Sequence, residues 1–187
     1  SQVVYDVYSE GGDGSSWEQA KHIYSLNALQ SIESGKHYKL MADIDASGFT
    51  SINSMSVYID GQYHKITGLS QPLFTTLSGG VVRNLIIENC SVTGTDNVGA
   101  IAGTASNAAR IYNCGVLGTN STVSGTGNVG SLVGRLQNTA RVINCYSFAN
   151  VSGGTNAAGI VGNNTGNFTN AADGPGNSMV MTCMFYG

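Results

Sequence analysis

The sequence predicts an all-β protein, a right-handed parallel β-helix whose successive coils stack along one axis. Two sequence elements recur 31 residues apart: residues 97–103 return as residues 128–134, and residues 109–116 return as residues 140–147. The chain holds 26 Gly and only 2 Pro in 187 residues, and β-branched residues dominate each unit. This composition disfavours repeated helical pairs. The units, 24 to 31 residues long, are too short for propeller blades, which need about 40–50 residues.

The segment before the repeats is predicted to form a short N-terminal cap and the first coils. Residues 3–8 form the first candidate strand, and the glycine-rich residues 11–16 interrupt it. A helix is expected over residues 26–34, capped by Ser25 and ended by Gly35. We expect this helix to cover the N-terminal end of the solenoid, because an open end would expose unpaired strand edges.

Two further strand segments follow, and together they complete the entry to the repeat array. Residues 38–45 and 57–66 read as strands, and the second contains an Asp60-Gly61 turn. Residues 1–80 carry eight acidic residues and four Lys but no Arg, whereas residues 81–187 carry three acidic residues and four Arg. We therefore expect one continuous structural domain, with a cap and first coils at 1–80 and repeats at 81–187.

Three sets of repeated residues are predicted to have structural roles in the coils. Aliphatic side chains should point inward, asparagines should stack as an amide ladder at one corner, and glycines should allow positive φ or close backbone approach at another corner. The aliphatic set is Ile86, Ile111 and Val142; the asparagine set is Asn89, Asn113 and Asn144; the glycine set is Gly103, Gly134 and Gly162.

The four cysteines are predicted to form a buried column of free thiols. Cys90, Cys114 and Cys145 occupy the same apparent repeat position, and Cys183 is placed there too. Stacked strands would separate them by about 4.8 Å with parallel Cα–Cβ bonds, whereas a disulfide needs Cβ atoms about 3.8 Å apart and tilted together. A disulfide and a metal site remain alternatives, but no C-x-x-C motif supports zinc.

These motifs resemble the GLUG-motif proteins, named for a Gly-Leu-x-Gly signature. Residues 129–134 carry the pattern almost as that family does, and residues 98–103 and 158–162 carry looser versions. The capped helix, residues 38–45 and residues 59–66 also resemble the usual lead-in of these proteins. The resemblance implies a β-helical module of secreted or surface proteins of bacteria, often Bacteroidetes. Such modules accompany adhesins, carbohydrate-active enzymes and immunoglobulin-cleaving metallopeptidases, so the resemblance implies no single chemistry.

Composition narrows the classes of partner and location. Charged residues make up 10% of the chain, against roughly 25% in typical domains, which suits an extracellular or outer-membrane surface protein. A net charge of −3 with eight Lys and Arg gives no basic stripe, so a nucleic-acid partner is not expected. No apolar run approaches the 18 or more residues of a membrane span. We expect the isolated domain to be monomeric.

Catalytic motifs are not apparent in the sequence. The three histidines are isolated, without an H-E-x-x-H motif, and no G-x-S-x-G occurs. No cofactor or metal set is therefore predicted. Asp43 and Asp45 share one face of a strand and could bind Ca²⁺ or flank an inverting hydrolysis. The alternative is that they accept backbone N–H groups at the first coil.

Candidate ligand-binding residues are arginines and aromatic residues. Arg110 and Arg141 occupy equivalent positions and could bind an anionic glycan, although a solvated row covering the coil edge is favoured. Tyr112 and Tyr146 are candidates for sugar stacking. Tyr58, Tyr63 and Phe148 would extend that platform if they face the same way.

The favoured function is a non-enzymatic surface or secreted module that serves in adhesion or binds a glycan or a host surface protein. The first rival is a β-helical carbohydrate-active enzyme, either a polysaccharide lyase or a glycosidase. Its difficulty is that the 11 acidic residues lie mostly outside the repeats. The second rival is a structural spacer within a larger surface enzyme.

Overall fold

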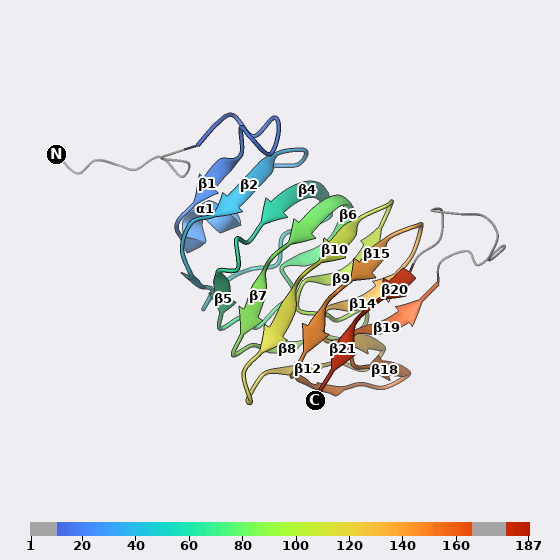
Figure 1. Ribbon diagram of the computed structural model, residues 1–187. Coiled ribbons are helices and arrows are strands. Elements are labelled where there is room, and N and C mark those ends of the chain that lie inside the picture. The colour runs from blue at the N-terminus through green and yellow to red at the C-terminus, as the bar shows by residue number, and fades with distance from the viewer. Residues whose placement is uncertain (1–10, 166–178) are drawn as a thin grey trace.

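The computed structural model describes residues 11–165 and 179–187, and it is a parallel β-helix (Figure 1). The predicted strand at residues 3–8 lies outside the described residues. Within the described part of the chain, all the pairs between named strands are parallel. The predicted fold class is therefore confirmed. The coils run from the N-terminal α1 in blue to β21 in red (Figure 1).

The strands form four sheets that run along the solenoid axis. The ten-stranded sheet, here called sheet A, contains β1 (Lys21–Ile23), β2 (His37–Leu40), β4 (Met55–Asp60), β6 (Phe74–Arg83), β9 (Ala102–Ser106), β10 (Arg110–Tyr112), β14 (Val133–Leu136), β15 (Arg141–Ile143), β19 (Val161–Asn164) and β20 (Met179–Met181). The six-stranded sheet, here called sheet B, contains β3 (Ile44–Asp45), β5 (Lys65–Thr67), β7 (Ile86–Glu88), β11 (Gly115–Leu117), β16 (Tyr146–Ser147) and β21 (Met184–Phe185). The two smaller sheets contain β8 (Ser91–Thr93), β12 (Thr122–Ser124) and β17 (Asn150–Ser152), and β13 (Asn128–Gly130) and β18 (Asn156–Ala158).

The helix is shorter than the sequence predicts. α1 spans Leu26–Gln30, and the Ser25 hydroxyl caps it by accepting a hydrogen bond from the Ala28 N–H at 3.2 Å. Leu29 is buried and joins the hydrophobic core beside Ile23. α1 lies at the N-terminal end of the stack (Figure 1). No helix in the described ranges has the length and apolar character that a membrane crossing requires.

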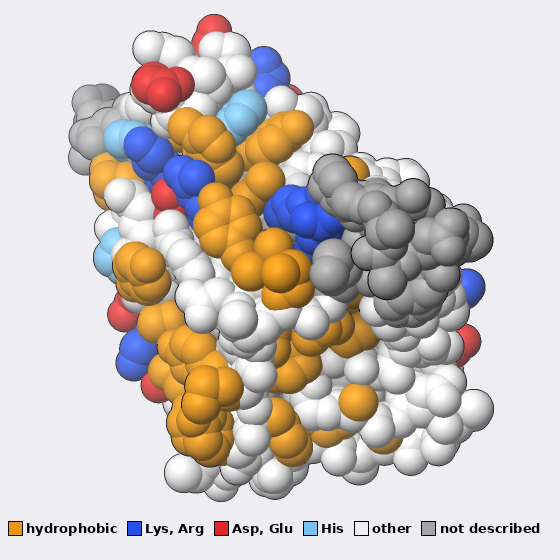
Figure 2. Space-filling view, turned by 45° about the vertical axis from the view of Figure 1, so that its right-hand side comes forward, with side chains coloured by type: hydrophobic (Ala, Val, Ile, Leu, Met, Phe, Trp, Pro, Cys, Tyr) orange, Lys and Arg blue, Asp and Glu red, His pale blue; other side chains and the backbone are white. Residues whose placement is uncertain are grey.

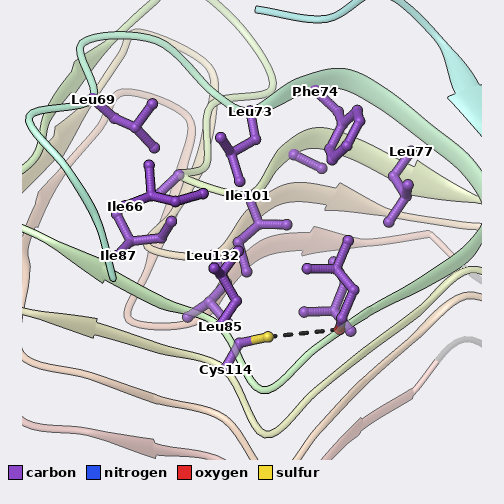
Figure 3. Close-up of a cluster of buried hydrophobic side chains, with 14 of the residues drawn as sticks. Ile66, Leu69, Leu73, Phe74, Leu77, Leu85, Ile87, Ile101, Cys114 and Leu132 are labelled. Carbon is purple, nitrogen blue, oxygen red and sulfur yellow. Dashed lines mark hydrogen bonds between the residues drawn. The ribbon is translucent and has the colours of Figure 1, made fainter. Parts of the chain in front are cut away.

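The core is one cluster of buried hydrophobic side chains, mostly aliphatic, that extends from Ile23 to Ile160. Figure 3 shows part of it: Ile66 and Ile87 come from one pair of adjacent coils, Ile101 and Leu132 come from another, and all four point into the same interior. Inward positions stack in register along sheet A as Ile59, Val82, Ile111 and Val142. Burial of these columns supplies most of the favourable energy of the solenoid. The predicted boundary between residues 80 and 81 falls inside β6.

The strand register corrects the predicted aliphatic set at one position. Ile86 pairs with Gly115 in sheet B and is only partly buried. The residue level with Ile111 in the core is Val82. Ile111 and Val142 themselves are neighbours and fully buried.

The glycine set lies in register across β9, β14 and β19. Gly134 is level with Gly103 and Gly162, because Val133 pairs with Ala102 and Val161. These glycines are required for close packing and not for positive φ. A Cβ atom on Gly134 would lie 2.3 Å from the backbone nitrogen of Val98. Any larger residue would therefore push two coil segments apart.

The asparagine and cysteine sets each contain one residue that the structure places elsewhere. Asn84 and not Asn89 is level with Asn113, because Arg83 pairs with Tyr112 and Ile86 pairs with Gly115. Likewise Leu85 occupies the position equivalent to Cys114, while Cys90 lies beside Ser121, whose hydroxyl accepts from the Cys90 N–H at 3.2 Å. The cysteine column is therefore Cys114, Cys145 and Cys183. All four thiols are free.

The thiols are largely shielded from solvent, and each contacts a backbone carbonyl oxygen. Cys90, Cys114 and Cys145 are buried, and Cys183 is half-buried. The Cys114 sulfur contacts the Val82 carbonyl oxygen at 3.6 Å, which Figure 3 marks by a dashed line. Contact with the Cys114 thiol, together with burial, raises the pKa of Cys145. The pKa of Cys183 is raised by its contact with Cys145 and by burial, so both thiols stay protonated at neutral pH.

Candidate functional site

A ladder of amide side chains runs along the corner between sheets A and B. Asn84, Asn113 and Asn144 each adopt a left-handed backbone conformation there, with φ of 53°, 54° and 50°. Asparagine tolerates this conformation better than other residues with a Cβ atom. Asn144 Nδ2 donates to Asn113 Oδ1 at 2.6 Å, and Asn113 Nδ2 donates to Asn84 Oδ1 at 3.3 Å.

The ladder begins at a buried acidic residue. Asn84 Nδ2 donates to Asp60 Oδ1 at 3.1 Å. The Asp60 carboxylate also forms an ion pair with Arg83, 3.1 Å from Nε to Oδ2, and accepts from the Gln62 N–H at 2.9 Å. Only 8% of the Asp60 surface is exposed, so these partners offset the cost of burying the charge. The sequence indicates only a turn residue here and misses the role of Asp60 in anchoring the ladder.

Two tyrosines flank the outer part of the ladder. Tyr63, Asn113, Asn144 and Tyr146 line a shallow pocket of about 260 Å³. Tyr63 is 64% exposed and lies at a corner with φ of 60°. The Tyr146 ring covers Gly115, where a Cβ atom would lie only 2.4 Å from the ring. The glycine at that position therefore lets Tyr146 lie along the coil beneath it.

Further aromatic side chains extend this surface along the outer side of sheet B. Phe148 lies edge-on to Tyr146, with ring centroids 6.4 Å apart, and stacks on Tyr186 at 4.7 Å. Phe148 and Tyr186 are 44% and 55% exposed. Figure 2 shows that exposed hydrophobic side chains gather into continuous bands. We call Tyr63, Asn113, Asn144, Tyr146 and Phe148 the tyrosine–amide surface.

The structure separates the four ligand-binding residues that the sequence predicts. Tyr146 belongs to sheet B, whereas Arg110, Tyr112 and Arg141 belong to sheet A. Tyr63 and Phe148 join Tyr146 on the sheet B side, but Tyr58 does not. Tyr58 stacks on His37, with ring centroids 4.2 Å apart.

The arginine pair takes part in the local structure of the coils. Arg110 and Arg141 are paired neighbours in sheet A. One guanidinium nitrogen of Arg110, Nη1, donates to the carbonyl oxygens of Thr139 at 2.7 Å and Ala108 at 2.9 Å. Burial and the charge of Arg141 lower the pKa of Arg110. Arg110 thus holds two adjacent turns together, as expected for a side chain that covers the coil edge.

Tyr112 is tied into a second network on the outer side of sheet A. Arg83 Nη1 donates to the Tyr112 hydroxyl at 3.1 Å, and the Arg83 guanidinium lies 3.9 Å from the centre of the Trp17 ring. This network joins the entry segment to the first repeats. Its polar groups bond one another, whereas the tyrosine–amide surface keeps exposed rings and amides.

Asp43 and Asp45 each accept hydrogen bonds from neighbouring groups in the first coils. Asp43 Oδ1 accepts from the Lys65 N–H at 2.9 Å and contacts His64 Nδ1 at 3.1 Å. Asp45 Oδ1 accepts from the N–H and the hydroxyl of Ser47, at 3.0 and 2.6 Å. These hydrogen bonds lower the pKa of both carboxyl groups. Neither is thus suited to act as a general acid near neutral pH.

A second pocket, of about 350 Å³, lies on another side of the coil. Five of its lining residues are threonines, and Asp96 and Asn97 also line it. Asp96 Oδ1 already accepts from the N–H groups of Asn97 and Asn128, each at 2.9 Å. No aromatic ring lines this pocket. Among the described residues, no group of three or more His, Cys, Asp or Glu could hold a metal ion.

Comparison with known proteins identifies the family. Residues 25–118, just over half of the chain, match the model of the M26 IgA1-specific metallo-endopeptidase N-terminal region. The chain belongs to this family. Residues 125–152 match the GLUG motif, which confirms the resemblance predicted from the sequence.

Individual relatives of this M26 N-terminal region are much longer proteins. An immunoglobulin A1 protease of Streptococcus sanguinis is 34% identical over 106 residues, which cover 49% of this chain and 6% of that protein. Halomucin of Haloquadratum walsbyi is 34% identical over 123 residues, covering 52% of this chain and 1% of that protein. The chain thus spans only a small part of these relatives.

A solved structure shares the fold. A candidate immunoglobulin A1 protease from Bacteroides ovatus superposes with a TM-score of 0.76 at 24% identity, over 97% of this chain and 60% of that one. At 24% identity, this likeness supports the fold and nothing further.

Proposed function

We propose that this chain is a non-catalytic β-helical module of a larger secreted or bacterial surface protein, and that it binds saccharides at the tyrosine–amide surface. The observation that carries the proposal is the pocket lined by Tyr63, Asn113, Asn144 and Tyr146. Tyrosine rings offer flat apolar faces with a polar edge, and amides both donate and accept hydrogen bonds. A sugar ring needs both kinds of contact.

The shape of the site suits an extended ligand. Its volume of about 260 Å³ is below the roughly 300–1,000 Å³ of pockets that enclose a small molecule. Phe148 and Tyr186 continue the aromatic surface beyond the pocket. A saccharide chain could place one ring between the tyrosines and rest its neighbours along sheet B. Because the coils are tightly packed, binding should need little rearrangement.

The family supports a role beside an enzyme. The M26 name describes a metallo-endopeptidase, and the S. sanguinis relative is named an immunoglobulin A1 protease. We propose that the parent protein carries its catalytic centre elsewhere and that this module holds it near a glycosylated surface. A host protein that binds through its polypeptide alone, or a spacer role without a ligand, would produce a different result in the test below.

The test is a glycan array with the purified chain and three alanine variants. We expect Tyr63→Ala and Tyr146→Ala each to weaken binding at least about tenfold, which is about 1.4 kcal/mol. The control is Tyr24→Ala, because Tyr24 is also exposed, at 42%, but lies beside His22 outside the site. Failure to bind any glycan, or equal loss in all three variants, would contradict the proposal.

A further inference from the structure

The amide ladder has a fixed direction, which is set by its first residue. Asp60 pairs with Arg83 as a carboxylate, and a carboxylate can only accept hydrogen bonds. Asn84 must therefore present Nδ2 to Asp60 and Oδ1 to the next coil. Asn113 must in turn present Nδ2 to Asn84 and Oδ1 to Asn144, and Asn144 must present Nδ2 to Asn113. The assignment of oxygen and nitrogen in each amide thus follows from the network.

The ladder ends at Asn144 with an exposed oxygen. Asn144 is exposed and donates one Nδ2 proton to Asn113 Oδ1. Thr182 continues the same corner in the next coil, with φ of 47°. Among the described residues, no hydrogen bond has Asn144 Oδ1 as its acceptor, and Asn144 takes part in the ladder only as a donor. Aligned amides polarise one another, so this carbonyl oxygen is a stronger acceptor than that of an isolated asparagine.

Positive charge is missing from the pocket itself. Its four lining residues, Tyr63, Asn113, Asn144 and Tyr146, are neutral. Arg110, a candidate for an anionic glycan in the sequence, lies on sheet A, and its Nη1 donates to three carbonyl oxygens. Arg83 is paired with Asp60. An anionic ligand would therefore lose hydration without gaining an opposite charge.

From this arrangement we infer that the tyrosine–amide surface selects neutral saccharides and rejects acidic ones. A sugar hydroxyl donates to Asn144 Oδ1, and a neighbouring hydroxyl accepts the remaining Nδ2 proton. A carboxylate in the same place could accept the Nδ2 proton but has no proton to donate to Asn144 Oδ1, so its charge would face the polarised oxygen. The inference rests on the proposed saccharide binding and adds the class of saccharide to it.

Matched pairs of oligosaccharides test the selectivity. One pair is β-1,4-linked mannohexaose and its hexamannuronate counterpart, and a second is α-1,4-linked hexagalactose and hexagalacturonate. In each pair that binds, we expect the neutral member to bind at least tenfold more tightly by calorimetry. Equal or tighter binding of the acidic member would overturn the inference while leaving saccharide binding intact. Absence of binding by every member of the pairs and by a glycan array would overturn both proposals.

The salt dependence of binding distinguishes two causes of the selectivity: contacts at Asn144, and general repulsion of anions by the net charge of −3. The pairs are measured at about 0.05 M and about 0.5 M NaCl, because the higher ionic strength screens distant charges. Selectivity that persists at high salt supports a local acceptor at Asn144. Selectivity that disappears there would assign the effect to general repulsion and overturn the inference.

A substitution of Asn144, the last amide of the ladder, tests its role directly. Asn144→Gly removes the acceptor but tolerates the left-handed corner, and we expect it to lower the neutral preference to less than threefold. Asn107→Gly is the matched control, since Asn107 is exposed with φ of 51° at another corner. Thermal melting confirms that both variants fold. An unchanged preference in folded Asn144→Gly would overturn the inference.

Discussion

Asn144 Nδ2 donates a 2.6 Å hydrogen bond to Asn113 Oδ1 on the preceding coil. The two residues are 31 positions apart and occupy the same corner. The same two amides therefore have two roles: they connect adjacent coils, and they line the candidate pocket.

Asn113 lies in the middle of the ladder, so its removal should affect both neighbours. Asn113→Ala leaves Asn84 Oδ1 without its donor and Asn144 Nδ2 without its acceptor. We expect a loss of roughly 1–3 kcal/mol in the free energy of unfolding, measured by denaturant titration. The exposed Asn120 should tolerate alanine within about 0.5 kcal/mol. Asn113→Gly, which keeps the left-handed backbone accessible, distinguishes the lost amide from backbone strain. Equal unfolding midpoints for Asn113→Ala and Asn120→Ala would argue against the ladder.

The cysteine column should respond to alkaline pH. The folded-state pKa of Cys145 is raised above the reference value of 9.0, so its contribution to stability is complete below about pH 9. It is lost as the pH rises further, because the unfolded thiol ionises first. We expect the melting temperature to fall as the pH rises above about 9, and to fall less in Cys145→Ala. An identical slope in the variant would contradict this assignment.

Thiol titration gives an independent reading of the same column. The native protein should react slowly with Ellman's reagent, because three thiols are buried and Cys183 is half-buried. Denaturation without reductant should release all four equivalents. Two equivalents or fewer under these conditions would mean disulfides and a different arrangement of the coils.

Gly134 should be the least replaceable of the three equivalent glycines Gly103, Gly134 and Gly162, because its Cβ atom would come closest to a neighbouring backbone. In Gly134→Ala the added Cβ would lie 2.3 Å from the Val98 nitrogen and 2.4 Å from the Asn97 carbonyl carbon. Both are backbone atoms, so the coils must move, and we expect a loss of about 3 kcal/mol or more. Gly35→Ala is the comparison, since its Cβ meets nothing within 4 Å although φ is 79°. It should cost only the backbone strain, about 1–2 kcal/mol. Circular dichroism melts that rank Gly35→Ala as the more damaging change would reject the packing argument.

The sequence predicts the repeat correctly where two coils have the same length. Residues 97–103 and 128–134, and likewise Cys114 and Cys145, lie 31 residues apart, so equal spacing identifies equivalent positions. The earlier coil is shorter, and the Asn-Cys pair at Asn89 and Cys90 resembles the pair at Asn113 and Cys114. This resemblance suggests the wrong register, in which Asn89 is equivalent to Asn113. Left-handed corners favour asparagine at more than one place in a coil, and Asn89 also has φ of 51°.

A better signal for the register was present in the alternation of side chains. Val82, Arg83 and Asn84 repeat the inward, outward and corner order of Ile111, Tyr112 and Asn113. The site was harder to predict, because Tyr63 and Tyr146 come from different coils and meet only through the fold. The contribution of Asp60 depends on a contact with Asn84, 24 residues later, which no local pattern reveals.

The isolated chain should show no turnover of polysaccharides, although parallel β-helices can carry such activity. Asp43 and Asp45 are the paired carboxylates that the sequence suggests for catalysis, and each accepts a hydrogen bond from a backbone N–H group. Their lowered pKa values keep both groups ionised at neutral pH, so neither can supply the proton that a leaving group needs. We expect no depolymerisation of a panel of host and plant polysaccharides, with or without Ca²⁺, by reducing-end and unsaturated-product assays. Turnover that disappears in Asp43→Asn or Asp45→Asn, while glycan binding by those variants is retained, would instead place a catalytic site at the first coils.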